Sequence, residues 1–317
     1  MADHSEIAAA VESGRYLMIS GPTAAGKSGL ALALAEQGRG VVINADSMQL
    51  YSDLRVVTAR PDPEDETRVP HRLYGVIDGS ERASVAVWLS MVAGEVARAR
   101  ADGRLPIIVG GTGMYLQAAL EGIAPIPEVP DDIHAACLAQ LADQGGAAFR
   151  AELATLDQVT ADRLFDGDSQ RLVRAMGVAR ATGRPISAWQ SDPHEGALSG
   201  TAVTVAVVPP REQTYQRIDD RFAAMMASGA VEEVELLLKR RLDASLPVMK
   251  ALGVREIGAM LAGEIRRERA VELACRDSRH YAKRQMTWIR NNFNAEMTVM
   301  EKFSESIIQK IFSILSK

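Results

Sequence analysis

The sequence predicts an α/β protein in which helices cover both faces of a parallel β-sheet and an all-helical segment is inserted into the chain. Three observations lead to this prediction. Short runs rich in β-branched residues alternate with helical patterns, a glycine-rich turn joins the first run to the first helical pattern, and residues 121–200 contain helical patterns only.

Five apolar runs have the length and composition of buried strands. Because each is followed by a glycine or polar turn and then by a helical pattern, the strands are expected to lie parallel. The runs cover residues 16–20, 41–45, 73–77, 106–109 and 202–208.

The helical patterns complete the predicted organisation. Outside the insertion they cover residues 29–36, 211–228, 231–240, 254–262, 268–293 and 303–315. The last pattern spaces apolar residues as a packed terminal helix would. We therefore expect residues 1–120 and 201–317 to form a core domain with C-terminal helices, and residues 121–200 to form a helical insertion domain. Three prolines between residues 125 and 130 mark the entry to the insertion.

Composition and charge limit the class of protein. The chain has 317 residues with 47% hydrophobic and 24% charged residues, which is a normal globular balance. Its 36 basic and 41 acidic residues leave a net charge of −5, so nucleic acid would have to bind to local basic patches. The two cysteines lie far apart and form no zinc motif. Without a signal-peptide pattern or a long apolar run, we expect a cytoplasmic protein that does not enter a membrane.

A complete phosphate-binding motif, G-x-x-x-x-G-K-[ST], follows the first strand. Its glycines permit a tight loop whose amides face phosphate oxygens, and the helix that follows adds its N-terminal dipole. The motif predicts a P-loop NTPase-like core that binds a di- or triphosphate, without identifying the group transferred. The predicted diphosphate-binding residues are Gly21, Pro22, Thr23, Ala24, Ala25, Gly26, Lys27 and Ser28.

Two further turns are expected at the same edge of the sheet. Asp46 ends the second strand, where ligand sites of open α/β sheets lie, although an aspartate there can also cap a helix. The polar neighbours Ser47 and Gln49 favour a functional role for this turn. The Gly-Gly-Thr-Gly turn at residues 110–113 follows the fourth strand, and by itself such a turn is a weak signal.

Eight motifs along residues 17–293 resemble one known family. In chain order they are GPTAAGKS, NADSMQLY, TARP, PHRLYG, VGGTGMYLQAALEG, DSQRLVRA, YQRIDDRF and KRQMTWIRN. Together they are similar to the bacterial tRNA dimethylallyltransferases, the tRNA isopentenyltransferase family. The resemblance implies transfer of a dimethylallyl group from dimethylallyl diphosphate to N6 of adenosine 37, flipped out of the anticodon loop, in tRNAs that read codons beginning with U. It also implies Mg²⁺ as cofactor, Ser28 as its ligand, and a monomer without an obligate protein partner.

The resemblance assigns three catalytic roles. Asp46 matches the general base, Thr23 the threonine that reaches the bridging oxygen of the diphosphate, and Arg221 the arginine that grips the diphosphate. A guanidinium suits that anion because it can donate two parallel hydrogen bonds. From the residues alone, Arg221 could instead be an exposed helix charge that pairs with Asp220 or Glu212.

The resemblance also assigns contacts to tRNA, several of them in the insertion domain. They are Asp46, Ser47, Met48, Gln49, Thr112, His134, Gln170, Arg171, Leu172, Val173, Arg174, Lys250, Arg255, Lys283, Arg284, Gln285 and Arg290. The family pattern has an arginine where this chain has His134, which weakens the expected contact at neutral pH. Residues 276–290 carry five Lys or Arg against one Asp, and helical spacing gathers most of the polar ones into one stripe. Such a stripe is often only a solvated face, and the match to the family favours phosphate binding.

Two alternatives remain open from the sequence. An adenylate isopentenyltransferase or a P-loop small-molecule kinase would explain the P-loop and Asp46, but not the basic stripe or the insertion. A non-catalytic RNA-binding NTPase switch would need a second strand that ends in paired acids, and the sequence contains no convincing one.

Overall fold

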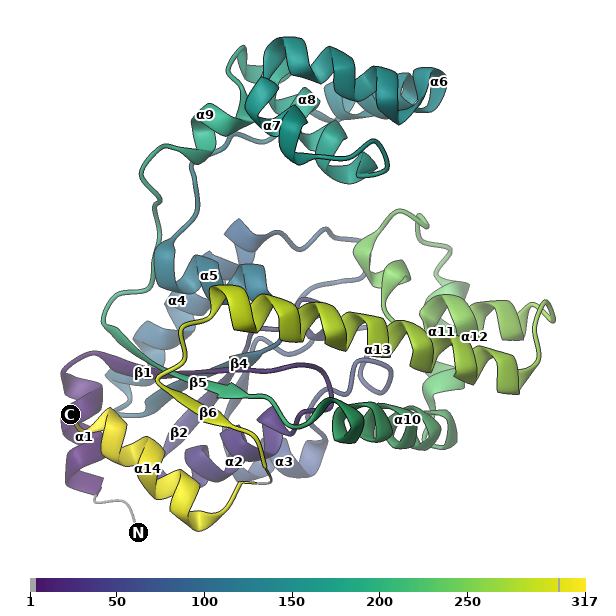
Figure 1. Ribbon diagram of the computed structural model, residues 1–317. Coiled ribbons are helices and arrows are strands. Elements are labelled where there is room, and N and C mark those ends of the chain that lie inside the picture. Colours follow the sequence, from purple (N-terminus) through teal and green to yellow (C-terminus); the bar gives the residue numbers. More distant parts are fainter. Residues whose placement is uncertain (1–3, 302) are drawn as a thin grey trace. The chain divides into compact units, whose positions relative to one another are not determined.

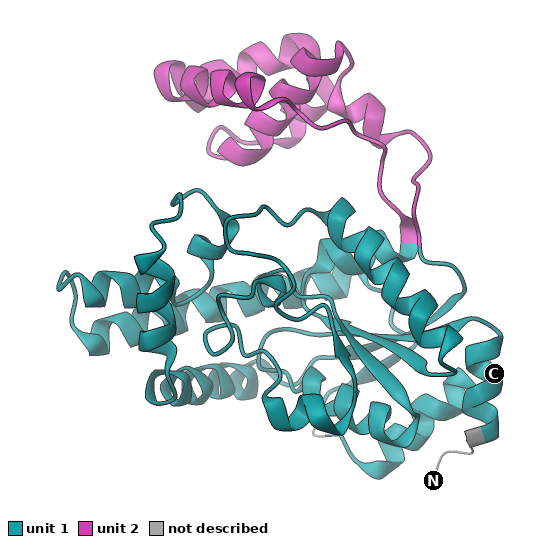
Figure 2. Cartoon of the chain, turned by 180° about the vertical axis from the view of Figure 1, so that it is seen from behind, with its two compact units in different colours: residues 1–120, 198–317 teal, residues 121–197 magenta. Residues whose placement is uncertain are grey.

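The computed structural model describes residues 4–301 and 303–317. It divides into two compact units (Figure 2). Unit 1 comprises Met1–Leu120 and Leu198–Lys317, and unit 2 comprises Glu121–Ala197.

Unit 1 is built on a six-stranded, all-parallel sheet (Figure 1). The strand order is β3-β2-β4-β1-β5-β6, so β1 lies between β4 and β5. Leu17 of β1 pairs with Ile107 of β4 and with Val203 of β5. The parallel sheet flanked by helices confirms the predicted fold class. The strands are β1 (Arg15–Ser20), β2 (Gly40–Asn44), β3 (His71–Arg72), β4 (Leu105–Gly110), β5 (Thr201–Val207) and β6 (Met297–Val299).

One predicted strand was wrong. The apolar run at residues 73–77 is not a strand, and β3 consists of only the two residues before it. Leu73 has a φ of 63°, a left-handed conformation that ends strand geometry. Ile77 forms only an isolated bridge to Tyr51. The short strand β6 was not predicted, because three residues carry too little pattern to identify.

Helices cover both faces of this sheet (Figure 1). Each helical range predicted outside the insertion matches a helix of the structure, and both ends agree within two residues. Those of unit 1 are α1 (His4–Glu12), α2 (Lys27–Gln37), α3 (Pro63–Arg68), α4 (Val85–Ala101), α5 (Gly113–Glu121), α10 (Arg211–Ala227), α11 (Ala230–Lys239), α12 (Val254–Leu261), α13 (Arg267–Asn292) and α14 (Glu305–Leu315), with short 3₁₀ turns at Met48–Leu50 and Pro247–Lys250.

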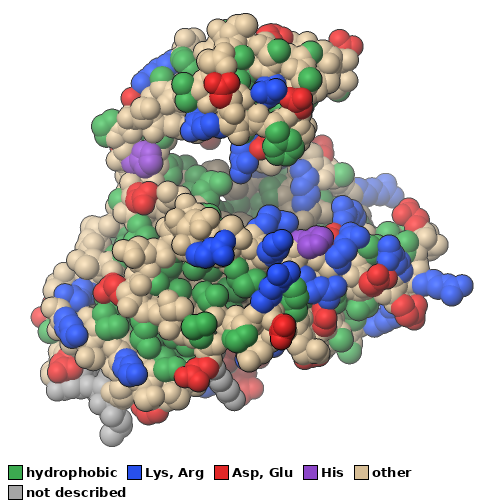
Figure 3. All heavy atoms as spheres, viewed as in Figure 1, with side chains coloured by type: hydrophobic (Ala, Val, Ile, Leu, Met, Phe, Trp, Pro, Cys, Tyr) green, Lys and Arg blue, Asp and Glu red, His purple; other side chains and the backbone are tan. Residues whose placement is uncertain are grey.

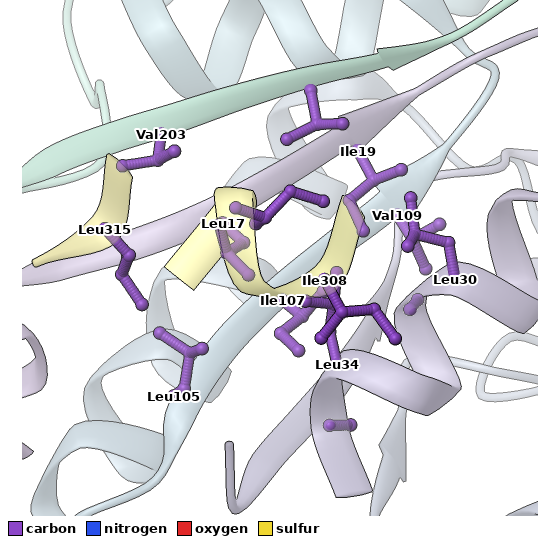
Figure 4. Close-up of a cluster of buried hydrophobic side chains, with 14 of the residues drawn as sticks. Leu17, Ile19, Leu30, Leu34, Leu105, Ile107, Val109, Val203, Ile308 and Leu315 are labelled. Carbon is purple, nitrogen blue, oxygen red and sulfur yellow. The ribbon is translucent and has the colours of Figure 1, made fainter. Parts of the chain in front are cut away.

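The terminal helix α14 packs into the main core, as its periodicity predicts. Ile308 and Leu315 lie against the apolar faces of β1, β4 and α2 (Figure 4). Ile311 and Leu315 are fully buried. The end of the chain therefore contributes to the stability of the sheet that carries the P-loop.

Unit 2 is helical, with α6 (Asp131–Leu156), α7 (Gln158–Arg163), α8 (Ser169–Thr182) and α9 (Ile186–Gln190). Its own core gathers Phe149, Leu153, Leu172, Val173 and Met176. The side chains of Leu172 and Val173 are 0% and 1% exposed, so they hold α8 in this core and cannot reach a tRNA. The predicted tRNA contacts of these two side chains are therefore wrong. No helix in the described parts of the chain is both long and apolar enough to cross a membrane.

Candidate active site

The glycine-rich loop joins β1 to α2 as the motif predicts. Gly26 and Ala24 adopt left-handed conformations, with φ of 97° and 60°, and these curl the loop. A side chain at Gly21 would collide with the carbonyl oxygen of Val207, since β5 ends beside the loop. Residues 23–29 line a pocket of about 360 Å³, and α2 begins at Lys27 within it. The first turn of a helix thus faces a space that suits an anion.

Lys27 is held inside the loop. Its Nζ donates a hydrogen bond to the carbonyl oxygen of Pro22 at 2.7 Å. Burial lowers the pKa of Lys27 to about 8, although the carboxylate of Asp46 opposes this shift. A polyanion in the pocket would favour the charged ammonium, so this lysine fits a phosphate ligand.

Asp46 is positioned by the end of β2. Its backbone N–H donates to Asn44 Oδ1 at 2.8 Å, and the buried Asn44 side chain donates in turn to the carbonyl oxygens of Asp46 and Leu73. Asp46 Oδ1 accepts the N–H of Met48 at 3.0 Å, so the carboxylate also bonds to the first residue of the following 3₁₀ turn. Burial raises the pKa of Asp46, while Lys27 and the Met48 N–H lower it. A carboxylate with a raised pKa is a stronger proton acceptor than an exposed one.

Arg221 reaches the P-loop from α10. Its Nη2 donates to Thr23 Oγ1 at 2.5 Å, and the residue is half-buried. The alternative of an exposed charge paired with Asp220 or Glu212 is therefore wrong. Asp220 accepts a hydrogen bond from Gln216 instead. Burial lowers the pKa of Arg221, and the charge of Asp46 opposes that shift.

A second pocket of about 290 Å³ adjoins the first. Both pockets are lined by Thr23, Asp46, Thr58 and Arg221. The second one adds apolar side chains from α10 and neighbouring loops. These are Val57, Ile218, Phe222, Met225 and Leu252. A polar pocket and a mainly apolar one therefore meet at three predicted catalytic residues, Thr23, Asp46 and Arg221.

Residues 46–49, which the resemblance assigns to tRNA binding, lie at this junction. Ser47 and Met48 line the apolar pocket, and Gln49 lines the P-loop pocket. The Gln49 side chain donates to the carbonyl oxygens of Thr58 and Ala59, at 2.9 Å each, so it also fixes the pocket wall. Thr112 Oγ1 accepts the backbone N–H of Ser47 at 3.0 Å, which ties the second glycine turn to this segment.

Gln285 has a different role from the predicted tRNA contact. It is 5% exposed, and its amide bonds to the backbone of Thr23 and of Gly111. The prediction of a direct tRNA contact by this side chain is therefore wrong. The second glycine turn accommodates α13: a side chain at Gly111 would collide with Gln285, and one at Gly113 with Trp288.

The opposite face of α13 is basic and exposed. Lys283, Thr287 and Arg290 face solvent, as the helical spacing predicts, and Arg284 is exposed as well. Figure 3 shows Lys and Arg side chains gathered over this helix. Among the described residues, no ion pair is formed by Lys283, Arg284 or Arg290, whose charges remain available to phosphates.

The other predicted tRNA contacts differ in their availability. Lys250 is exposed and lines the apolar pocket as well. Arg255 forms ion pairs with Glu256 at 2.8 Å and Asp277 at 3.0 Å, so its charge is largely neutralised within the protein.

In unit 2, the exposed predicted contacts lie on α8 and at the start of α6. Gln170, Arg171 and Arg174 are exposed on α8, and His134 is exposed in the first turn of α6. Arg171 pairs with Asp168 at 2.8 Å, whereas Arg174 donates to the carbonyl oxygen of Pro127 at 3.4 Å.

Several pocket residues were not predicted from the sequence. Ile218, Phe222 and Met225 follow one face of α10 at intervals of four and three residues, beside Arg221. That spacing was visible in the sequence, but it reads equally as a core face. Tyr281 lines the apolar pocket, and its burial raises the pKa of the phenol. Nothing in its local sequence indicates this role.

The described residues offer little for a metal ion on their own. No group of three or more His, Cys, Asp or Glu side chains in this part of the chain could hold one. Ser28 lines the P-loop pocket and supplies one hydroxyl oxygen. Such a donor set fits a cation that is held mainly by a phosphate ligand and water.

Comparisons with known proteins identify the family. The family model described as IPP transferase matches residues 49–292, and the one described as isopentenyl transferase matches residues 14–82. A protein of Rhodospirillum rubrum named tRNA dimethylallyltransferase is 50% identical over 304 residues, which cover 94% of this chain and 93% of that protein. One of the same name from Paramagnetospirillum magneticum is 48% identical over 93% of this chain and 94% of its own.

Solved structures agree with this result. The full-length tRNA isopentenylpyrophosphate transferase of Bacillus halodurans has a TM-score of 0.68 at 28% identity and covers 95% of both chains. A eukaryotic dimethylallyltransferase acting on tRNA has a TM-score of 0.74 at 25% identity, covering 87% of this chain and 69% of its own. The match of a family model to most of the chain, together with relatives near 50% identity along almost its whole length, shows that this chain belongs to the IPP transferase family.

Proposed function

We propose that this protein transfers a dimethylallyl group from dimethylallyl diphosphate to N6 of adenosine 37 in tRNA. Its relatives are named for this class of reaction. The observation that carries the proposal is the meeting of a polar and a mainly apolar pocket at Thr23, Asp46 and Arg221. An allylic diphosphate has the same two-sided chemistry, with a polyanionic head and a short apolar tail.

The leaving group explains the P-loop. In the transfer, the lone pair of adenine N6 forms a bond to C1 of the allyl group while the C1–O bond breaks, and diphosphate leaves with the electron pair. Negative charge grows on the diphosphate in the transition state, so loop amides, Lys27 and Arg221 that face this charge lower the barrier. Thr23, oriented by Arg221, would donate its hydroxyl to the bridging oxygen.

Asp46 is the proposed general base. The N6 nitrogen becomes cationic as it attacks, and one of its protons passes to the carboxylate. The carboxylate accepts the backbone N–H groups of Met48 and Gln49, which orient it toward the pocket where the amine would bind. The raised pKa of Asp46 supports this role, since it brings the base closer to neutral pH.

Mg²⁺ is the proposed cofactor. Ser28 would hold it together with the oxygens of the diphosphate, in the manner usual for magnesium bound to phosphate substrates. When bound, the ion offsets part of the negative charge on the leaving diphosphate.

The tRNA is the proposed macromolecular substrate. Because N6 of adenosine 37 must reach Asp46, the base is expected to leave its stack and enter the pocket beside Ser47 and Met48. Lys283, Arg284 and Arg290 on α13 are proposed to bind the phosphates around it, and Gln170 and Arg174 on α8 to add contacts from unit 2.

The test is a transfer assay with competing acceptors. Purified protein, Mg²⁺ and radiolabelled dimethylallyl diphosphate are incubated with unmodified tRNA, with AMP and ATP present, and the products are digested to nucleosides and separated. N6-dimethylallyladenosine serves as the reference compound in this separation. Label in that nucleoside from tRNA alone supports the proposal, label in free nucleotide assigns an adenylate acceptor, and phosphoryl transfer without label identifies a kinase.

A further inference from the structure

Gln285 is a buried amide that joins two loops of the active-site edge. Its Oε1 accepts the backbone N–H of Thr23 at 2.8 Å, and its Nε2 donates to the carbonyl oxygen of Gly111 at 2.9 Å. Both partners are backbone groups, so the amide spans a fixed distance between the P-loop and the second glycine turn. The side chain is 5% exposed and makes these contacts away from solvent.

The surroundings leave this amide little freedom. A side chain at Gly111 would collide with Gln285, and the Tyr281 hydroxyl bonds to the side chains of Gln285 and Thr112. Thr112 accepts the N–H of Ser47 in turn. Helix α13 is thus connected through hydrogen bonds to the loops that follow β1, β2 and β4.

Thr23 is held from two sides at this point. Gln285 fixes its backbone, and Arg221 donates to its hydroxyl oxygen. Removing the amide would leave the Thr23 N–H and the Gly111 carbonyl without their partners in a buried place, and the loop would relax to find others. The hydroxyl of Thr23 would then lose its fixed position relative to Arg221.

We infer that Gln285 is a positioning residue for the transfer reaction, which holds Thr23 where its hydroxyl meets the diphosphate. The inference rests on the proposed function and assigns to α13 a second task besides its exposed basic face. Gln285 acts through Thr23 and touches neither the diphosphate nor the tRNA. It therefore affects diphosphate binding and turnover, and not the affinity for tRNA.

The experiment compares Gln285→Met with the wild type. Methionine fills a similar volume without either hydrogen bond. We expect inorganic pyrophosphate, measured by calorimetry with Mg²⁺, to bind about 5- to 20-fold more weakly, which corresponds to the loss of about one or two hydrogen bonds. We expect kcat to fall about 10- to 100-fold, while the Kd for tRNA stays within about twofold. The control is Glu272→Gln, an exposed substitution on the same helix that should change none of these values.

A second variant separates positioning from folding. Gln285→Asn keeps the amide but is one methylene too short to reach both loops, and it should show the same split between kcat and tRNA affinity. In a Thr23→Ala background, Gln285→Met should lower kcat by less than about threefold, because the group it positions is gone.

Three results would overturn the inference. The first is that Gln285→Met lowers kcat by the same factor in the wild-type and Thr23→Ala proteins. The second is a loss of tRNA affinity as large as the loss of kcat. The third is that both Gln285 variants bind pyrophosphate as tightly as the wild type. If the wild type itself does not label tRNA, the proposed function fails, and the pyrophosphate titration still decides the role of Gln285.

Discussion

Replacing Asp46 by asparagine tests the central step of the proposed reaction. Asparagine has the same shape, and its oxygen can still accept the Met48 N–H that Asp46 Oδ1 now accepts at 3.0 Å. The change therefore removes the proton acceptor and leaves the turn in place. A general base contributes a factor of about 10² to 10⁴ to a rate. We expect kcat to fall by that factor, which corresponds to about 3 to 5 kcal/mol of transition-state stabilisation.

The matched variant is Asp46→Ala, which also removes the hydrogen bond to Met48. It should lose about 1 kcal/mol more stability than the asparagine variant, and its Tm should be lower by about 2 to 4 °C. Both variants should bind tRNA within about threefold of the wild type, since the base acts mainly in the transition state.

The pH profile gives an independent reading of the same step. Burial raises the pKa of Asp46, so protonation on the acid side should remove the base and lower kcat in the wild type. The asparagine variant should lack this acid limb. Single-turnover transfer with labelled substrate, repeated across the pH range, measures the rate of the wild type and of the asparagine variant. A kcat within about threefold of the wild type, or a loss of tRNA affinity as large as the loss of rate, would refute the assignment of Asp46 as the base.

Four further predictions follow from the site. Arg221→Lys removes the hydrogen bond to Thr23 and the two parallel hydrogen bonds that a guanidinium can donate to the diphosphate. The KM for dimethylallyl diphosphate should therefore rise about 10- to 100-fold in steady-state kinetics. An unchanged KM would mean that a single positive charge at this position is sufficient for diphosphate binding. Because the pKa of Lys27 is lowered to about 8, its ammonium is lost as pH rises above that value, and kcat/KM for the diphosphate should decline there; a flat profile to pH 10 would exclude Lys27 from binding. Lys283→Ala should reduce the slope of log Kd for tRNA against log salt concentration by about 0.7 to 0.9, and an unchanged slope would place this lysine outside the interface. Gly113→Ala would force Trp288 to move and should cost about 1 to 3 kcal/mol in urea unfolding, whereas wild-type stability would show that α13 yields easily.

The sequence predicts most of the sheet because its strands are buried on both faces and read as continuous apolar runs. The P-loop is predictable for a different reason, since its spacing is set by the shape of a phosphate. The run at residues 73–77 is apolar but does not continue the strand. Leu73 has a left-handed backbone conformation, and its carbonyl oxygen accepts a hydrogen bond from the side chain of Asn44, which also bonds to the backbone of Asp46. Composition alone does not distinguish these two uses of an apolar run.

Gln285 shows what the sequence signal missed and what it contained. The tRNA contact predicted for Gln285 came from the resemblance to the family, in a segment that also contains Lys283 and Arg284. Its position relative to its neighbours gave the other answer, because it lies three residues after Ala282 and four before Ile289, both of which are buried. The partners of the amide, Thr23 and Gly111, are 262 and 174 residues away, so only the fold reveals them.

The two glycine turns at this edge of the sheet have different physical causes. In the P-loop, Gly26 is required by its left-handed backbone, and Gly21 by the close approach of β5. In the second turn, Gly111 and Gly113 are needed because side chains of α13 lie directly against the backbone. The second turn thus has the composition of a phosphate-binding loop, but its glycines allow α13 to pack directly against it. Since α13 exposes its basic residues on the opposite side, this close packing places the proposed tRNA-binding surface at a fixed distance from the P-loop, as transfer from a bound diphosphate to a bound tRNA requires.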